Sequence, residues 1–324
     1  MSSNQYRNIL RAVGMAAAIA VCGWFSVAQA AQRTWTGTGD MQWSQPDSTS
    51  WDAPYAAGDD VLFTDTGLGT IQIVGTVTPS NLVFIHTSGT NTFIDNSAFL
   101  HAGGSFSNIG GGVVQFGNMA SAPLGGLTWT GATYIGNGSE LRLTRATHVG
   151  LPGTPINLNG GTVSFGADNS AVYVVSNPVV VAAGGGTIRA EFSGNLTRFQ
   201  LRDSITGSGP LRLQSVGSSP VYSGLGLWAD NSGFNGPVLI DSRAMDLPKP
   251  PTVRPAAVWF TNTASMFPNA SQIAVRDGGV LGVEFALSDA DLAKVQLGPR
   301  GGLAARFEGT FGGVSAPMAR IPAG

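Results

Sequence analysis

The chain has 324 residues, of which 46 are glycine, whereas Lys, Arg, Asp and Glu together make up only 11%. This composition favours short strands joined by tight corners over helices. The formal net charge is −2 and no basic block occurs, which excludes nucleic acid as an expected partner. A chain of this length forms one elongated domain or two compact ones.

Residues 1–30 have the pattern of a secretory signal peptide. Arg7 and Arg11 precede an apolar stretch from Ala12 to Ala28, and Ala28-Gln-Ala30 is a cleavage motif that makes Ala31 the expected mature start. A transmembrane anchor is the alternative, but the apolar run is short and the cleavage motif follows it. We therefore expect an exported protein.

Cys22 is the only cysteine of the chain and lies inside the predicted signal. Lipidation at Cys22 is a further alternative, although Val21 stands where a small residue is usual. The mature chain then has no cysteine, so we expect stacked strands rather than disulfides to stabilise it.

Residues 31–65 differ from the rest of the chain because three tryptophans, Trp35, Trp43 and Trp51, follow one another at intervals of eight. We expect this segment to be an N-terminal cap whose aromatic side chains cover the open end of a stack of strands. The alternative is that the tryptophans form exposed platforms for sugar rings.

A repeated unit organises residues 66–324. Between Leu151 and Phe165 a strand containing Ile156 and Leu158 is followed by Gly160-Gly161 and a strand containing Val163 and Phe165. Because side chains alternate along a strand, each apolar pair can face a common core. The pattern recurs between Phe267 and Val283, so we predict that Gly160-Gly161 and Gly278-Gly279 occupy equivalent corners of different coils.

The first glycines of the four clearest pairs are at positions 111, 160, 185 and 278. Their spacing approximates multiples of about 24 residues, which is typical of a solenoid. The alternative is a glycine-rich β-sandwich with antiparallel hairpins. For the solenoid we predict that Asn157, Ser164 and Arg189 point outward and that one interior contains Ile156, Leu158, Val163, Phe165, Ile188, Ile273, Val275, Leu281 and Val283.

One helical turn is expected in the mature chain, from Ser288 to Val295. Ser288 can cap it, and Asp289 and Asp291 lie at its start, where acidic side chains are favourable.

No catalytic, cofactor-binding or metal-binding residue is predicted. The three histidines, His86, His101 and His148, are far apart, and a scattered set of structural histidines is favoured over a metal site. Solvated acids of the cap are likewise favoured over a calcium site for the acidic stretch, which contains Asp40, Asp47, Asp52, Asp59, Asp60 and Asp65. Asp289 and Asp291 are expected to serve capping rather than glycoside cleavage.

Three segments resemble the autotransporter-associated β-strand repeat: 160–165 (GGTVSF), 205–213 (ITGSGPLRL) and 231–236 (NSGFNG). The opening of the chain, with its tryptophans and the segment 58–63 (GDDVLF), is similar to the leader that often precedes such repeats. The resemblance covers most of residues 33–310. It implies an all-β, right-handed parallel β-helix on the outside of a Gram-negative-type bacterium. Passengers of this kind normally precede a membrane barrel, so we expect residues 66–324 to be a repeat region truncated at its C-terminal end. The alternative is a protein that leaves the cell by another route.

The expected function is that of a secreted or surface-displayed passenger with a structural or adhesive role, and not that of an enzyme. Cell-surface glycans, or host and neighbouring surfaces, are the expected partners, with membrane attachment only through a C-terminal translocator outside these residues. The alternative is a carbohydrate-active β-helix enzyme, a polysaccharide lyase or hydrolase, which needs an acid or base cluster in a groove. The scarcity of charged residues argues against it. A third interpretation is a stalk that displays a further C-terminal part.

Overall fold

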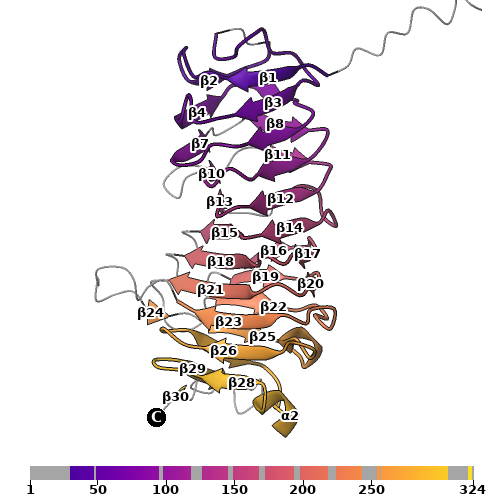
Figure 1. The fold of residues 1–324 in the computed structure, drawn as a ribbon, viewed down its shortest axis with the longest axis vertical. Coiled ribbons are helices and arrows are strands. Elements are labelled where there is room, and N and C mark those ends of the chain that lie inside the picture. Colours follow the sequence, from indigo (N-terminus) through magenta and orange to yellow (C-terminus); the bar gives the residue numbers. More distant parts are fainter. Residues whose placement is uncertain are drawn as a thin grey trace, which may run out of the picture. The chain divides into compact units, whose positions relative to one another are not determined.

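The computed structural model describes residues 30–46, 49–94, 98–117, 126–144, 149–167, 172–192, 198–217, 224–242, 254–255, 257–305 and 320–322. The described strands belong to the unit Gln32–Gly324. That unit is a parallel β-helix of about nine turns, with the strands of successive coils stacked in chain order (Figure 1).

Four sheets run along the stack. The eight-stranded sheet contains β1 (Gln32–Trp35), β3 (Asp60–Phe63), β6 (Leu82–Phe84), β9 (Phe106–Asn108), β12 (Thr133–Gly136), β14 (Ile156–Asn159), β17 (Val179–Val181) and β20 (Ile205–Gly207). The twelve-stranded sheet, called the long sheet below, contains β2 (Gln42–Trp43), β4 (Gly69–Ile73), β7 (Thr90–Ile94), β10 (Val113–Phe116), β13 (Glu140–Thr144), β15 (Gly161–Ala167), β18 (Gly186–Phe192), β21 (Leu211–Gly217), β23 (Pro237–Asp241), β26 (Gln272–Val275) and β28 (Val295–Leu297), with β24 (Arg254–Pro255) antiparallel to β21.

The remaining side is formed by a three-stranded and a seven-stranded sheet. The first contains β5 (Thr76–Val77), β8 (Phe99–Ala102) and β11 (Gly126–Trp129). The second contains β16 (Val172–Val175), β19 (Arg198–Leu201), β22 (Gly224–Leu227), β25 (Ala257–Phe260), β27 (Val280–Val283), β29 (Gly302–Ala305) and β30 (Arg320–Pro322), which is antiparallel to β29. A typical coil, such as β14–β15–β16, visits the eight-stranded sheet, the long sheet and this third side in that order.

Strand pairing decides between the solenoid and the sandwich. Val163 of β15 pairs in parallel with Leu141 of β13 and with Ile188 of β18, close to the predicted coil of about 24 residues. Ile156 of β14 pairs with Thr133 and Val179 rather than with its neighbour β15. A hairpin sandwich would pair consecutive strands antiparallel, so the predicted β-helix is confirmed.

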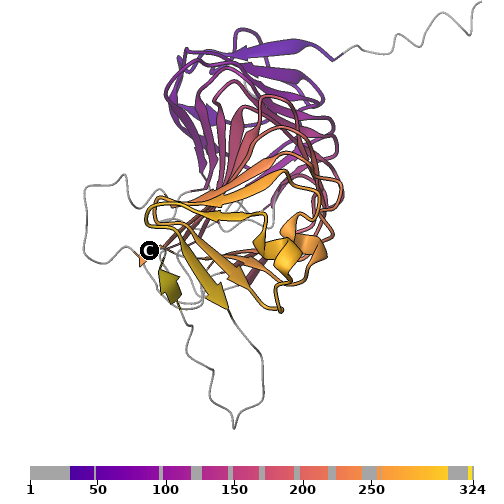
Figure 2. The same cartoon turned by 60° about the horizontal axis from the view of Figure 1, so that its bottom comes forward.

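A single apolar interior runs through the stack, and all nine predicted core residues belong to it. The sheets enclose this interior in Figure 2. Ser164 and Arg189 lie in the alternate, outward register of the long sheet, as predicted, but they are 3% and 8% exposed rather than solvated. Their burial is the first indication that the outer face of the long sheet is not an ordinary solvent face.

Aromatic side chains fill the N-terminal coils. Trp35, Trp43 and Trp51 are 0–4% exposed, and their rings pack on one another and on Phe63, which stacks on Phe84 with centroids 4.5 Å apart. Residues around Trp51 also run antiparallel to β1 and cover its outer edge. The aromatic cluster predicted for the cap is therefore present, and its buried rings offer no platform for a sugar.

The two predicted glycine corners are not equivalent, so that prediction is wrong. Gly160 joins β14 of the eight-stranded sheet to β15 of the long sheet, whereas Gly278 joins β26 of the long sheet to β27 of the seven-stranded sheet. Both glycines have a left-handed backbone, with φ of 83° and 81°. The residues that follow them, Gly161 and Gly279, leave no room for a Cβ, which would lie 2.5 Å from Ile135 and 2.3 Å from the Ile240 carbonyl oxygen. Different corners that impose the same backbone demands thus share one sequence signature.

The predicted helical turn is present but shorter than expected: α2 spans Asp289–Leu292, and Val295 is already the first residue of β28. Ser288 caps it: the Ser288 hydroxyl accepts from the Asp291 amide, and the Asp291 carboxylate accepts from the Ser288 amide at 3.0 Å. A 3₁₀ turn, η2 (Ala264–Met266), was not predicted. Among the described residues, no helix is long and apolar enough to cross a membrane.

Candidate functional site

The histidines considered as ligands do not come together. His86 is fully buried, and its Nδ1 lies 3.1 Å from the Ser88 carbonyl oxygen. His101 lies on the outer side of β8, with Nδ1 2.6 Å from the Thr128 hydroxyl. His148 lies outside the described residues. In the described ranges, no group of three or more His, Cys, Asp or Glu side chains could hold a metal ion.

The cap acids bind local partners. Asp52 accepts from the Thr34 amide and Asp65 from the Thr87 amide, while Asp59 pairs with Arg33 at 3.1 Å. Asp60 binds both the amide and the side chain of Asn81, and Asp40 accepts from Gln42. Asp47 lies outside the described residues. The hydrogen bond from the Thr87 amide holds the pKa of Asp65 below its usual value.

Six charged side chains and one amide gather instead on the outer face of the long sheet, in a set that we call the charge ladder: Glu140 and Arg142 on β13, Arg189 and Glu191 on β18, Arg212 and the amide Gln214 on β21, and Asp241 on β23. Arg142, Ser164, Arg189, Gln214 and Asp241 occupy the same position on five successive strands. These side chains lie next to one another because the strands of successive coils pair in this register.

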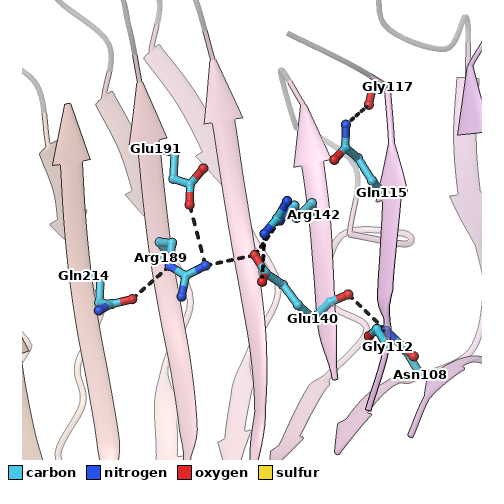
Figure 3. Close-up of polar contacts among 9 residues, drawn as sticks. All are labelled: Asn108, Gly112, Gln115, Gly117, Glu140, Arg142, Arg189, Glu191 and Gln214. Carbon is cyan, nitrogen blue, oxygen red and sulfur yellow. Dashed lines mark hydrogen bonds and ion pairs between the residues drawn. The ribbon is translucent and has the colours of Figure 1, made fainter. Parts of the chain in front are cut away.

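Arg189 is the centre of the ladder (Figure 3). Its Nη1 lies 2.9 Å from Glu140 Oε1 and 3.6 Å from Glu191 Oε1, and its Nε donates to Gln214 Oε1 at 2.8 Å. Ser164 stands between Arg189 and Arg142 in the register, and its small side chain leaves room for Arg189 to reach across β15. One guanidinium therefore connects β13, β18 and β21.

Both ends of the ladder are also paired. Arg142 forms a bidentate pair with Glu140, at 2.7 and 3.2 Å. At the other end Gln214 Nε2 donates to Asp241 Oδ1 at 2.7 Å, and Arg212 Nε donates to Asp241 Oδ2 at 2.7 Å. The side-chain Nδ2 of Asn108 donates to the backbone carbonyl of Glu140 at 3.0 Å and to that of Gly112 at 3.2 Å. These two hydrogen bonds connect β13 to the corner between β9 and β10 (Figure 3).

Burial gives these contacts their strength. The side chains of Arg189, Glu140 and Asp241 are only 10%, 13% and 3% exposed, so Coulombic attraction is screened less than at an open surface. The hydrogen bond to Glu140 raises the pKa of the Arg142 guanidinium above its usual value. Each carboxylate of the ladder lies within ion-pair distance of at least one guanidinium.

The carboxylates of the ladder are not arranged as a catalytic cluster. Glu140 and Glu191 meet at one nitrogen of Arg189, whereas Asp241 contacts Gln214 and Arg212 instead. Three carboxylates therefore do not converge in the part of the chain that the structure describes, consistent with the absence of any such group there. The arrangement holds the strands in register. For Glu140 to transfer a proton, its ion pairs with Arg142 and Arg189 would first have to break.

Sequence reasoning missed the ladder because Glu140 and Arg189 are two coils apart. The useful signal is an acid and a base that both occupy outward positions on strands of the same sheet. We recognised Arg189 only as an outward polar residue. Finding its partner requires the exact register of β13, β15 and β18, because a shift of one residue moves a side chain to the opposite face.

A second surface feature lies one residue beyond the ends of β19 and β22. Trp228 is 40% exposed, and the Arg202 guanidinium carbon lies 5.1 Å from its ring centroid. Both Nε and Nη2 of Arg202 donate to Gln200 Oε1, at 3.1 and 2.8 Å, which orients the guanidinium. The guanidinium lies over the Trp228 ring, so a ring-shaped ligand could stack only on the part of the ring that Arg202 leaves exposed.

Comparison with known proteins does not identify the chain. No family model, curated protein or solved structure matches it. The chain is compatible with a β-helix repeat protein, and a β-helix supports either a structural or an enzymatic role.

Proposed function

We propose that this protein is an exported, passenger-type β-helix with a structural and adhesive role at the surface of a Gram-negative-type bacterium. The observation that carries the proposal is the parallel stack of about nine turns, which has charged residues on the outer face of the long sheet that bind one another. Such a stack presents long faces on which many weak contacts can add up. The signal pattern of residues 1–30 and the resemblance to passenger repeats support export.

Export is tested by expressing the full chain in a Gram-negative host. We expect N-terminal sequencing to give Ala31 as the first residue and cell fractionation to recover the protein outside the cytoplasm. Changing Ala28 and Ala30 to Gln should block cleavage. An uncleaved protein that stays in the cytoplasm would overturn this part of the proposal.

Adhesion is tested by the binding of beads coated with the exported protein to bacterial and host cell surfaces and to immobilised glycans. We expect Trp228→Ala to lower glycan binding by about fivefold, because stacking on an exposed ring contributes on the order of 1 kcal/mol. Val172→Ala is the matched control, since Val172 is 54% exposed on the same sheet. No binding to any of these surfaces, or equal losses in both variants, would contradict an adhesive role centred on Trp228.

The second candidate is a carbohydrate-active enzyme, and the meeting of Glu140 and Glu191 at Arg189 is the observation in its favour. We expect no cleavage of neutral or acidic polysaccharides, as judged by new reducing ends and by the ultraviolet absorbance of unsaturated products. Activity that is present in the wild type and lost in a folded Glu140→Gln variant would reverse the ranking.

A further inference from the structure

The outer face of the eight-stranded sheet is almost free of charge. Only two charged residues occur in its eight strands, Arg33 on β1 and Asp60 on β3. Both are engaged, Arg33 with Asp59 and Asp60 with Asn81. This pattern contrasts with the long sheet, whose outer face carries the charge ladder.

Two outward rows cross this face. The first has one residue from each strand of the sheet, begins at Thr34, ends at Thr206 and includes Leu62, Val83, Tyr134 and Val180. Ser107 and Asn157 complete it on either side of Tyr134. The second row runs beside it and includes Ile85 and Ile109, which are neighbours on adjacent coils. All of these residues are uncharged.

Four apolar or aromatic side chains of the two rows are open to solvent. Tyr134 is 46% exposed, Ile85 and Ile109 are each 41% exposed, and Val180 is 37% exposed. Single exposed apolar residues are normal on a surface, whereas several of them gathered on one face point to an interaction site. Tyr134 lies on β12, one of the two central strands of the sheet order, and a central exposed tyrosine is typical of an interface anchor.

We propose that this face, which we call the neutral face, is the interface through which two copies of the chain associate. The absence of charge argues for a copy of itself as the occupant, because a two-fold arrangement that places the face against itself brings no like charges together. A charged partner would find no complement in these rows. The inference does not depend on the proposed adhesive role.

The size of the neutral face sets the strength of the association. Eight strands spaced about 4.8 Å apart make a sheet that extends roughly 34 Å along the stack. Each strand of three or four residues is about 10–13 Å long, and this length is the other dimension of the face. If each face is treated as a flat rectangle, pairing two of them buries roughly 800 Å² of surface in total. The uneven surface of real side chains makes the buried area larger. That is below the roughly 1,000 Å² that a stable interface buries, so we expect a weak, reversible dimer that depends on concentration and is not weakened by salt.

The test is sedimentation velocity of the full exported chain over a concentration series at low and high salt. We expect dimer to increase with concentration, and Val180→Glu to weaken dimerisation at least tenfold because it places a charge in the buried interface. Val172→Glu is the matched control: Val172 is an equally apolar, 54% exposed strand residue on the seven-stranded sheet. Thermal unfolding checks that both variants are folded.

A second measurement locates the interface. The sequence after residue 30 has no cysteine, so Tyr134→Cys introduces a single thiol near the expected two-fold axis. Mild oxidation should give a covalent dimer with Tyr134→Cys and not with Val172→Cys. A monomer at all concentrations, a dimer unaffected by Val180→Glu, or equal effects of the two glutamates would overturn the proposal. Binding of a different molecule to the neutral face of a monomer would do the same.

Discussion

Arg189 and Glu140 lie two strands apart on the long sheet, yet Arg189 Nη1 is 2.9 Å from Glu140 Oε1. The contact crosses β15 above Ser164, which is 3% exposed. It connects coils that are not neighbours, so it can form only when three strands have the correct register. The ladder around it therefore links the stability of the stack to strand alignment.

Arg189→Met is expected to destabilise the protein by about 3 kcal/mol, because it leaves Glu140 and Gln214 buried with fewer partners. Arg276→Met, in which the replaced side chain is 55% exposed, should change stability by less than about 0.5 kcal/mol. Urea unfolding curves measure both. The ladder has no structural importance if the two variants unfold alike.

Gly161→Ala should destabilise the protein by about 2 kcal/mol or more. The new Cβ would lie 2.5 Å from Ile135 Cγ2 and 2.7 Å from the Ile135 backbone, and that backbone cannot move without disturbing β12. Gly103→Ala is the control, because a Cβ there has no atom within 4 Å and the backbone is not left-handed. Thermal melts of the two variants should differ by several degrees, and equal melting temperatures would argue against this corner geometry.

Stability should fall in alkali as Tyr55 is forced to ionise. Burial, assisted by the nearby charge of Asp59, raises the pKa of Tyr55 above its ordinary value of 10.0. A pKa that is raised in the folded state means that folding favours the neutral phenol, so this contribution is complete below about pH 10 and is lost as the pH rises further. Unfolding measured from pH 8 to 12 should show the loss, and Tyr55→Phe should lessen it. An unchanged alkaline profile in Tyr55→Phe would contradict the assignment.

Tryptophan fluorescence should contain one strongly quenchable component. Of the tryptophans that the structure describes, Trp228 is 40% exposed, whereas Trp259 is 9% exposed and Trp35, Trp43, Trp51 and Trp129 are 0–4% exposed. Acrylamide should reach Trp228 alone, and Trp228→Phe should remove the accessible fraction. Substantial quenching that persists in this variant would mean that the aromatic cap is open.

The sequence by itself determined the class of fold and the composition of its interior. Alternation at Ile156, Leu158, Val163 and Phe165 assigns these side chains to one face whatever the neighbouring strand is, because alternation is a local property of the backbone. Gly160-Gly161 likewise identifies a corner, and Ser288 with Asp291 identifies a helix start. These features depend on residues that are near one another in the chain.

Only the tertiary structure decided which corner each glycine pair occupies, which charges meet and which face is neutral. Gly160 and Gly278 look alike because both corners need a left-handed residue followed by one without a side chain. Arg189 reaches Glu140, and Tyr134 lies in an uncharged row, because coils of unequal length stack in one particular register. The register depends on the packing of many strands that are far apart in the sequence. It therefore cannot be predicted from any one short segment.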